Sequence, residues 1–236
     1  MKTEAISYRH ESVELEGHLA YDPAKGPRPV VLVVHEWRGL NDYARKRAEQ
    51  LAGLGYVGFA IDMYGKGFLA KDATEAAKLM TPFVSDRQLC RARITAAYSI
   101  ARTLPQVDAT KIAAIGYCFG GLAALELARS GADLKAVATF HANLSLPTPA
   151  DARNIKAKVL ACHGADDPNV PPAQVAAFQD EMRQAKVDWQ FVAYGNTVHS
   201  FTFPGANSPA SGLMYNPTSD TRSWKLLELF LAEAFA

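Results

Sequence analysis

Short runs of consecutive apolar residues alternate with longer amphipathic segments along most of this 236-residue chain. Continuous apolar runs of about four to eight residues are typical of strands that are buried on both faces of a sheet. Segments that are wholly or mostly apolar predict strands at residues 30–34, 57–61, 112–115, 135–140, 157–162 and 188–194. Apolar positions spaced three or four residues apart predict the helices between them. These helices are expected at 41–53, 73–80, 87–103, 119–128 and 172–185, and at the end of the chain.

The first segment has a different pattern, because apolar and polar residues alternate between residues 6 and 21. This alternation predicts an antiparallel hairpin at a sheet edge. Strands that alternate with helices imply a mostly parallel central sheet of about seven to eight strands, with helices on both faces. We therefore predict a single α/β domain over residues 1–236, a length that suits one large domain better than two small ones.

Polar residues that can carry chemistry follow several of the predicted strands directly. In sheets of this class, ligands bind at the carboxyl ends of the strands. The residues at these positions are Glu36, Asp62, Cys118, His141, Asp167 and His199. We therefore expect most of the chemistry of the chain at one edge of the sheet.

Residues 116–121, Gly-Tyr-Cys-Phe-Gly-Gly, join a predicted strand to a predicted helix. A sharp turn in this context is the nucleophile elbow of an α/β-hydrolase fold, with Cys118 in place of the usual serine. Gly116 and Gly120 allow strand and helix to approach closely, and the helix N-terminus favours a thiolate. The alternative is a structural cysteine that packs as a small apolar residue.

A thiol nucleophile needs a base, and the base needs an orienting acid. The chain order in this fold is nucleophile, acid, histidine, so the acid candidates after Cys118 are Asp166 and Asp167. We prefer Asp167, because it lies three residues after Gly164 in a Gly-x-x-Asp-x-x-Val-Pro pattern. The other acid would then be a solvated turn residue. His199 is the only histidine after this turn and is the predicted base.

Acyl transfer also needs backbone N–H donors for the developing oxyanion. One donor is expected from Phe119, which follows the nucleophile, and the other from Trp37, which follows an earlier strand. His35, His141 and His163 also lie at strand ends, and we expect structural roles or pocket lining for them. The sequence contains no zinc-like spacing of ligands, so we expect neither a metal nor another cofactor.

Composition and charge narrow the class of protein. The chain is 49% hydrophobic and 21% charged, as in an ordinary globular protein. A formal net charge of +1 gives no electrostatic footprint for nucleic acid, and no apolar run suits a membrane. The N-terminus has no apolar signal region, and three widely spaced cysteines do not indicate disulfides. We therefore expect a cytoplasmic protein with reduced thiols.

With these residues assigned, the chain resembles the dienelactone hydrolase (carboxymethylenebutenolidase) family of α/β-hydrolases. The matching segments are Val-Val-His-Glu-Trp-Arg-Gly at 33–39, Asp-Met-Tyr at 62–64, the elbow at 116–121, His-Gly-Ala-Asp-Asp at 163–167 and Val-His-Ser-Phe at 198–201. The resemblance implies a triad of Cys118, Asp167 and His199. It also implies that Glu36 lies against the nucleophile and helps to generate the thiolate when substrate binds.

The expected substrate pocket departs from the family pattern. The best-known member binds the carboxylate of its lactone with arginines, one of which closely follows the His-Ser-Phe segment. This chain has Phe203 at that position instead. A second arginine of that member lies in the region that corresponds to Arg87 and Arg91 of this chain. Trp37, Tyr64 and Phe203 suggest a more apolar pocket. This departure leaves open whether the chain accepts dienelactone.

Together these residues predict a hydrolase of carboxylic esters or lactones that forms an acyl-thioester on Cys118. A thioesterase or another acyl-transfer enzyme with the same triad is an alternative, because the carbonyl chemistry is shared. A non-catalytic ligand-binding protein on a hydrolase scaffold is a second alternative, because a fold does not fix a function. The expected partner is a small-molecule ester or lactone, with no nucleic acid and no membrane. The sequence identifies neither the substrate nor the oligomeric state.

Overall fold

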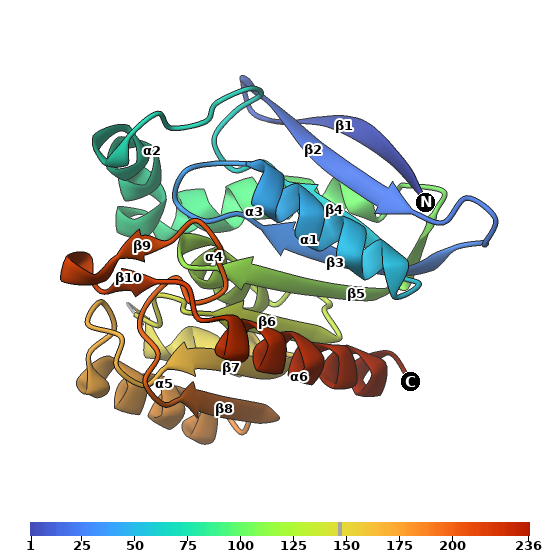
Figure 1. Cartoon of the computed structure of the whole chain (residues 1–236). Coiled ribbons are helices and arrows are strands. Elements are labelled where there is room, and N and C mark those ends of the chain that lie inside the picture. Colours follow the sequence, from blue (N-terminus) through green and yellow to red (C-terminus); the bar gives the residue numbers. More distant parts are fainter. Residues whose placement is uncertain (146–147) are drawn as a thin grey trace. The chain divides into compact units, whose positions relative to one another are not determined.

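The computed structural model describes residues 1–145 and 148–236. The chain divides into two compact units, Met1–Ile115 and Gly116–Ala236, and Figure 1 labels the helices and strands of both. The prediction of one domain over residues 1–236 stays a prediction.

The first unit begins with the antiparallel hairpin that the alternating pattern predicts. β1 (Lys2–His10) pairs along its whole length with β2 (Val13–Tyr21). β2 is antiparallel to β4 (Val57–Ile61), which pairs in parallel with β3 (Arg28–Val34). The strand order of this unit is β1-β2-β4-β3-β5, and β5 (Val107–Tyr117) ends two residues beyond the unit boundary.

The helices of the first unit are α1 (Asp42–Gly53), α2 (Ala73–Ser85) and α3 (Arg87–Ala101). The Asn41 side chain accepts a hydrogen bond from the N–H of Ala44, so a side-chain cap starts α1 as predicted. In Figure 1, α1 lies in front of β3 and β4, and α3 lies behind the strands of its unit. The helix α2 continues past its predicted end and through Pro82 to Ser85. The carboxylate of the next residue, Asp86, caps α3.

The second unit contains three parallel strands in the order β6-β7-β8 among its described residues. These strands are β6 (Ala136–Phe140), β7 (Lys158–Gly164) and β8 (Trp189–Tyr194). The accompanying helices are α4 (Phe119–Arg129), α5 (Pro172–Gln184), α6 (Pro217–Phe235) and the 3-10 helix η1 (Pro149–Asn154). In Figure 1, α6 lies in front of β6 and β7, and α4 lies behind the strands of its unit.

Two parts of the second unit differ from the sequence expectation. The strand β7 extends through His163 and Gly164, because its pairing with β8 continues to Gly164 opposite Tyr194. The segment 202–217 is more ordered than its composition indicated. It contains β9 (Asn207–Ser208) and β10 (Leu213–Met214), which pair antiparallel across the 3-10 turn η2 (Pro209–Ser211).

The strands carry the core of each unit. Every residue of β4 in the first unit and of β6 in the second is buried, as continuous apolar runs predict. The described residues form eight long strands, of which β1–β2 and β2–β4 are the antiparallel pairs and β3–β4, β6–β7 and β7–β8 are parallel. The predicted α/β-hydrolase architecture is therefore confirmed. Among the described residues, no helix combines the length and apolarity of a membrane span.

Candidate active site

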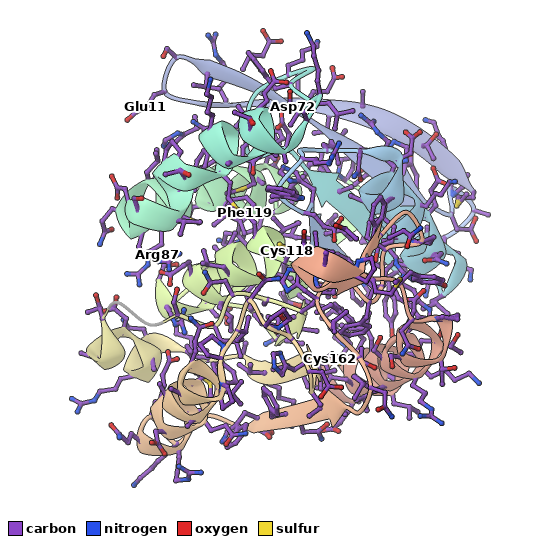
Figure 2. The ribbon with its side chains drawn as sticks, turned by 60° about the vertical axis from the view of Figure 1, so that its left-hand side comes forward. Glu11, Asp72, Arg87, Cys118, Phe119 and Cys162 are labelled. Carbon is purple, nitrogen blue, oxygen red and sulfur yellow. The ribbon has the colours of Figure 1, made fainter. Side chains whose placement is uncertain are left out.

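Cys118 occupies a sharp turn between β5 and α4. Its backbone has φ 54° and ψ −116°, a strained conformation for a residue other than glycine. A Cβ atom on Gly116 would overlap the carbonyl group of Gly120, so only glycine allows strand and helix to come this close. The N–H of Cys118 donates to the carbonyl of Phe140 at 3.0 Å. The predicted strand–turn–helix around the cysteine is thus present, and Figure 2 labels Cys118 and Phe119 at the start of α4.

The three cysteines lie in different environments. Cys90 and Cys162 are buried, whereas Cys118 is partly exposed. The thiol of Cys162 lies 3.7 Å from the hydroxyl of Tyr194, and burial raises its pKa to about 12. Cys118 is therefore the thiol that a solute reaches most readily.

Asp167 and His199 lie against one another. The Nδ1 atom of His199 is 2.7 Å from Oδ2 of Asp167, and both side chains are buried. The adjacent Asp166 is exposed and takes no part in this contact, although its N–H donates to the carbonyl of Thr197. Asp167 is thus the acid that the fold brings to the histidine.

Two backbone features bring this pair together. A Cβ atom on Gly164 would lie 2.5 Å from the carbonyl oxygen of Thr197, so the loop after β8 packs directly on the end of β7. On the other side, His199 forms an isolated parallel bridge with Leu213. Its N–H donates to Gly212 at 3.0 Å, and its carbonyl accepts from Met214 at 3.1 Å. His199 is therefore fixed from both sides by backbone contacts.

The electrostatics of His199 favour its charged form. Burial acts to lower its pKa, but the negative charge of Cys118 and hydrogen bonds with Asp167 and Cys118 outweigh burial and raise the pKa to about 10. Asp167 and Cys118 therefore both favour the protonated form of this imidazole.

Two other buried histidines lie in the same unit. His163 is in β7, and its ring centroid lies 5.5 Å from that of Phe191 at an interplanar angle of 44°. Burial lowers its pKa, the charge of Asp167 opposes that shift, and the charge of His199 adds to it. His141 follows β6 and contacts His199 edge-on. The sequence predicts structural roles or pocket lining for both histidines and no role for Thr202, whose buried hydroxyl bonds to His141. The signal available for Thr202 was its position three residues after the predicted base.

The remaining predicted site residues are distributed between the units. Glu36 is buried in the first unit. Tyr64 of the same unit is also buried, and its hydroxyl donates to the carbonyl of Trp37 at 3.0 Å. Arg87 begins α3. Phe203, in the second unit, is half-buried in the loop after His199. Their roles in the site stay predictions, and no group of three or more metal-ligating side chains occurs among the residues described.

Comparison with known proteins identifies relatives over nearly the whole chain. Residues 15–235 match the model of the dienelactone hydrolase family. An uncharacterized protein of Caenorhabditis elegans is 37% identical over 150 residues, which are 61% of this chain and 93% of that protein. A putative carboxymethylenebutenolidase of Synechocystis is 28% identical over 249 aligned residues, covering 99% of this chain and 98% of the relative.

Solved structures resemble the chain equally broadly. A dienelactone hydrolase-like promiscuous phosphotriesterase from metagenomic libraries is 42% identical, with a TM-score of 0.96 over 100% of this chain and 99% of the other. A putative dienelactone hydrolase from Klebsiella pneumoniae has a TM-score of 0.83 at 24% identity, covering 98% of this chain and 99% of its own. The second likeness supports the fold alone.

Proposed function

Because this chain belongs to the dienelactone hydrolase family, we propose that it hydrolyses carboxylic esters or lactones with Cys118 as the nucleophile. One observation carries the proposal. Cys118 lies at a strained elbow and acts to raise the pKa of His199, whose Nδ1 atom bonds to Asp167 at 2.7 Å. This is the order of contacts that nucleophilic catalysis requires.

In the first half of the reaction, the Cys118 thiolate attacks the acyl carbon and the carbonyl electrons move to oxygen. The tetrahedral intermediate then collapses, the C–O bond to the leaving group breaks, and the imidazolium of His199 gives its proton to the departing oxygen. An ester releases its alcohol at this step. A lactone opens, so that its hydroxyl stays attached to the acyl chain.

In the second half, His199 takes a proton from water while the water oxygen attacks the thioester carbon. The C–S bond breaks, the acid is released and the thiolate is restored. Asp167 holds the ring of His199 in the same orientation in both halves. The proposed oxyanion donors are the backbone N–H groups of Phe119 and Trp37, and such a donor is worth about 2.7–4 kcal/mol of transition-state stabilisation.

The residues assigned by family resemblance complete the proposal. Glu36 is the residue that promotes the thiolate. Tyr64, Arg87 and Phe203 are assigned to the substrate pocket. No metal or other cofactor takes part in the steps described.

Replacement of the nucleophile tests this function. The variant Cys118→Ala is expected to lose turnover of aryl esters and lactones by more than about 10³-fold. Intact-protein mass spectrometry should detect a covalent acyl adduct on the wild type, which hydroxylamine removes. Cys90→Ala is the matched control and should keep both turnover and adduct. Wild-type turnover in Cys118→Ala would reject this nucleophile, and tight ligand binding without any turnover would favour a non-catalytic binding protein.

The 42% identical relative supports a second candidate, because that protein is a promiscuous phosphotriesterase and its likeness spans this whole chain. The Cys118 thiolate would attack phosphorus and expel an aryl oxide, which His199 protonates. Water activated by His199 would then break the S–P bond, releasing a phosphate diester and the thiolate. An aryl diethyl phosphate tests this candidate. If no phenol is released under conditions where aryl esters are cleaved, the phosphotriesterase candidate is rejected and the ester hydrolase proposal is unaffected.

A further inference from the structure

The proposed function leaves His141, a fully buried histidine beside the candidate site, without a role. It directly follows β6, and its backbone has φ 41°, in the left-handed region that residues with a side chain rarely adopt. Its N–H donates to the carbonyl of Cys162 at 2.9 Å, so the pairing of β6 with β7 holds it there. Unfavourable backbone conformations of this kind persist where the surroundings enforce them, often at functional sites.

The ring of His141 contacts the segment that carries the proposed base. Its centroid lies 5.0 Å from that of His199 at an interplanar angle of 66°, and 5.3 Å from that of Phe201 at 79°. Its Nε2 atom is 2.8 Å from the hydroxyl oxygen of Thr202. One buried side chain therefore contacts His199 and two of the three residues that follow it.

These contacts complete the support of the His199 ring. The Asp167 carboxylate fixes its Nδ1 atom, and the bridge to Leu213 fixes its backbone. Both contacts lie on the Nδ1 side or on the backbone of His199, so neither supports the face of the ring. The ring of His141 contacts the His199 ring edge-on and is bonded to Thr202. Because His141 follows β6 and Thr202 lies in the loop after β8, this bond restricts rotation of the His199 ring.

We propose that His141 and Thr202 form a clamp that holds the His199 ring in the orientation required by Asp167 and Cys118. The inference rests on the proposed function, since it assigns the clamp to the same base. His141 acts here as a positioning residue through His199 and does not act on substrate.

Two conservative substitutions test the clamp. Thr202→Val removes the hydroxyl with little change of shape, and His141→Phe keeps an aromatic ring but removes Nε2. Each should lower kcat for an aryl ester by about three- to tenfold, the range expected for one lost hydrogen bond, and leave KM nearly unchanged. The double variant should lose no more than the more affected single variant, because both substitutions remove the same bond. Thr139→Val, a buried threonine on β6, is the matched control.

A second readout does not depend on turnover. The rate of alkylation of Cys118 by iodoacetamide, measured against pH, reports on the thiolate–imidazolium pair. Thr202→Val should shift this profile from that of the wild type, whereas Thr139→Val should not. Should His141→Phe fail to fold, Thr202→Val decides the question by itself.

Two results would overturn the clamp. One is a Thr202→Val variant with the kcat and alkylation profile of Thr139→Val, while Cys118→Ala is inactive. The other is a double variant whose losses multiply. Wild-type turnover in Cys118→Ala is a different outcome, because it rejects the proposed function itself.

Discussion

Asp167 and His199, which follow two neighbouring parallel strands, are joined by a hydrogen bond of 2.7 Å between Oδ2 and Nδ1. The bond occupies Nδ1 of the imidazole and leaves Nε2 as the ring nitrogen that is not bonded to Asp167. Both side chains are buried, so the carboxylate is shielded from water and its effect on the ring is strong. This relationship makes Asp167 the orienting group of the proposed base.

The adjacent acids provide a matched pair for testing that assignment. Asp167→Asn should lower kcat by about 10²-fold or more, because an amide no longer holds the imidazole in the required tautomer and orientation. Asp166→Asn changes an exposed side chain and should keep kcat within about twofold, as expected of a substitution away from the site. Ester hydrolysis at saturating substrate measures both. Equal losses in the two variants would contradict the assignment.

The titration of His199 should depend on Cys118. Burial acts to lower the pKa of His199, but interactions with Cys118 and Asp167 raise it to about 10. Cys118→Ala removes the contribution of the sulfur and leaves that of Asp167, so the pKa of His199 should fall and the ring should lose its proton at lower pH. NMR titration of the imidazole measures the shift, and Cys90→Ala should leave it unchanged. An identical titration in wild type and Cys118→Ala would show that the two side chains do not interact.

Alkylation should distinguish the cysteines by more than their exposure. Cys118 is expected to react first with iodoacetamide near pH 7, whereas Cys162 should stay unlabelled because burial raises its pKa to about 12. His199→Gln should slow the labelling of Cys118, since the imidazolium that stabilises its thiolate is gone. Peptide mapping by mass spectrometry measures all three sites. A labelling rate unaffected by His199→Gln would mean that accessibility alone sets the reactivity of Cys118.

Features encoded by local sequence could be predicted well. The buried run at 30–34, the cap at Asn41 and the elbow around Cys118 each depend on neighbours close in the chain. The choice of Asp167 as the acid at the turn came from its spacing to Gly164, and the structure brings that acid to His199. Such features are predictable because strand pattern, cap chemistry and glycine placement act over a few residues.

Features that depend on packing could not be predicted in the same way. The pairing of Gly164 with Tyr194 draws His163 into β7, and that extension depends on a strand far away in sequence. The contact between His141 and Thr202 joins residues 61 positions apart. No pattern in the sequence around either residue indicates that the two side chains meet. The small hairpin within 202–217 could not be predicted either, because its strands are only two residues long and so show no alternating pattern.

Gly116 should be intolerant of even one added methyl group. The Cβ atom of Gly116→Ala would overlap the backbone of Gly120, which cannot move without opening the elbow. We expect a loss of at least about 2 kcal/mol in the free energy of unfolding, together with loss of ester hydrolysis. Gly195→Ala is the control, because nothing lies within 4 Å of the added atom. Urea unfolding measures both, and a Gly116→Ala protein as stable and active as the control would contradict the close approach.

A buried ion cluster in the second unit gives a prediction about stability. The Arg129 guanidinium donates through Nε and a terminal nitrogen to both oxygens of Glu181 at 2.8 and 2.7 Å, and through its other terminal nitrogen to Glu126 at 2.9 Å. All three side chains are buried, and the cluster joins α4 to α5. Arg129→Ala should cost about 3–5 kcal/mol of unfolding free energy, because it leaves two carboxylates buried without their cation.

The exposed ion pair of Arg183 with Asp180 is the matched control for this arginine. Arg183→Ala should cost less than about 1 kcal/mol, since water screens the pair. The triple variant Glu126→Leu/Arg129→Met/Glu181→Leu should recover much of the stability lost in Arg129→Ala, because it removes the unpaired charges together. Denaturant unfolding of the wild type and the three variants measures these differences. A triple variant less stable than Arg129→Ala would mean that the geometry of the cluster, and not the isolation of its charges, sets the cost.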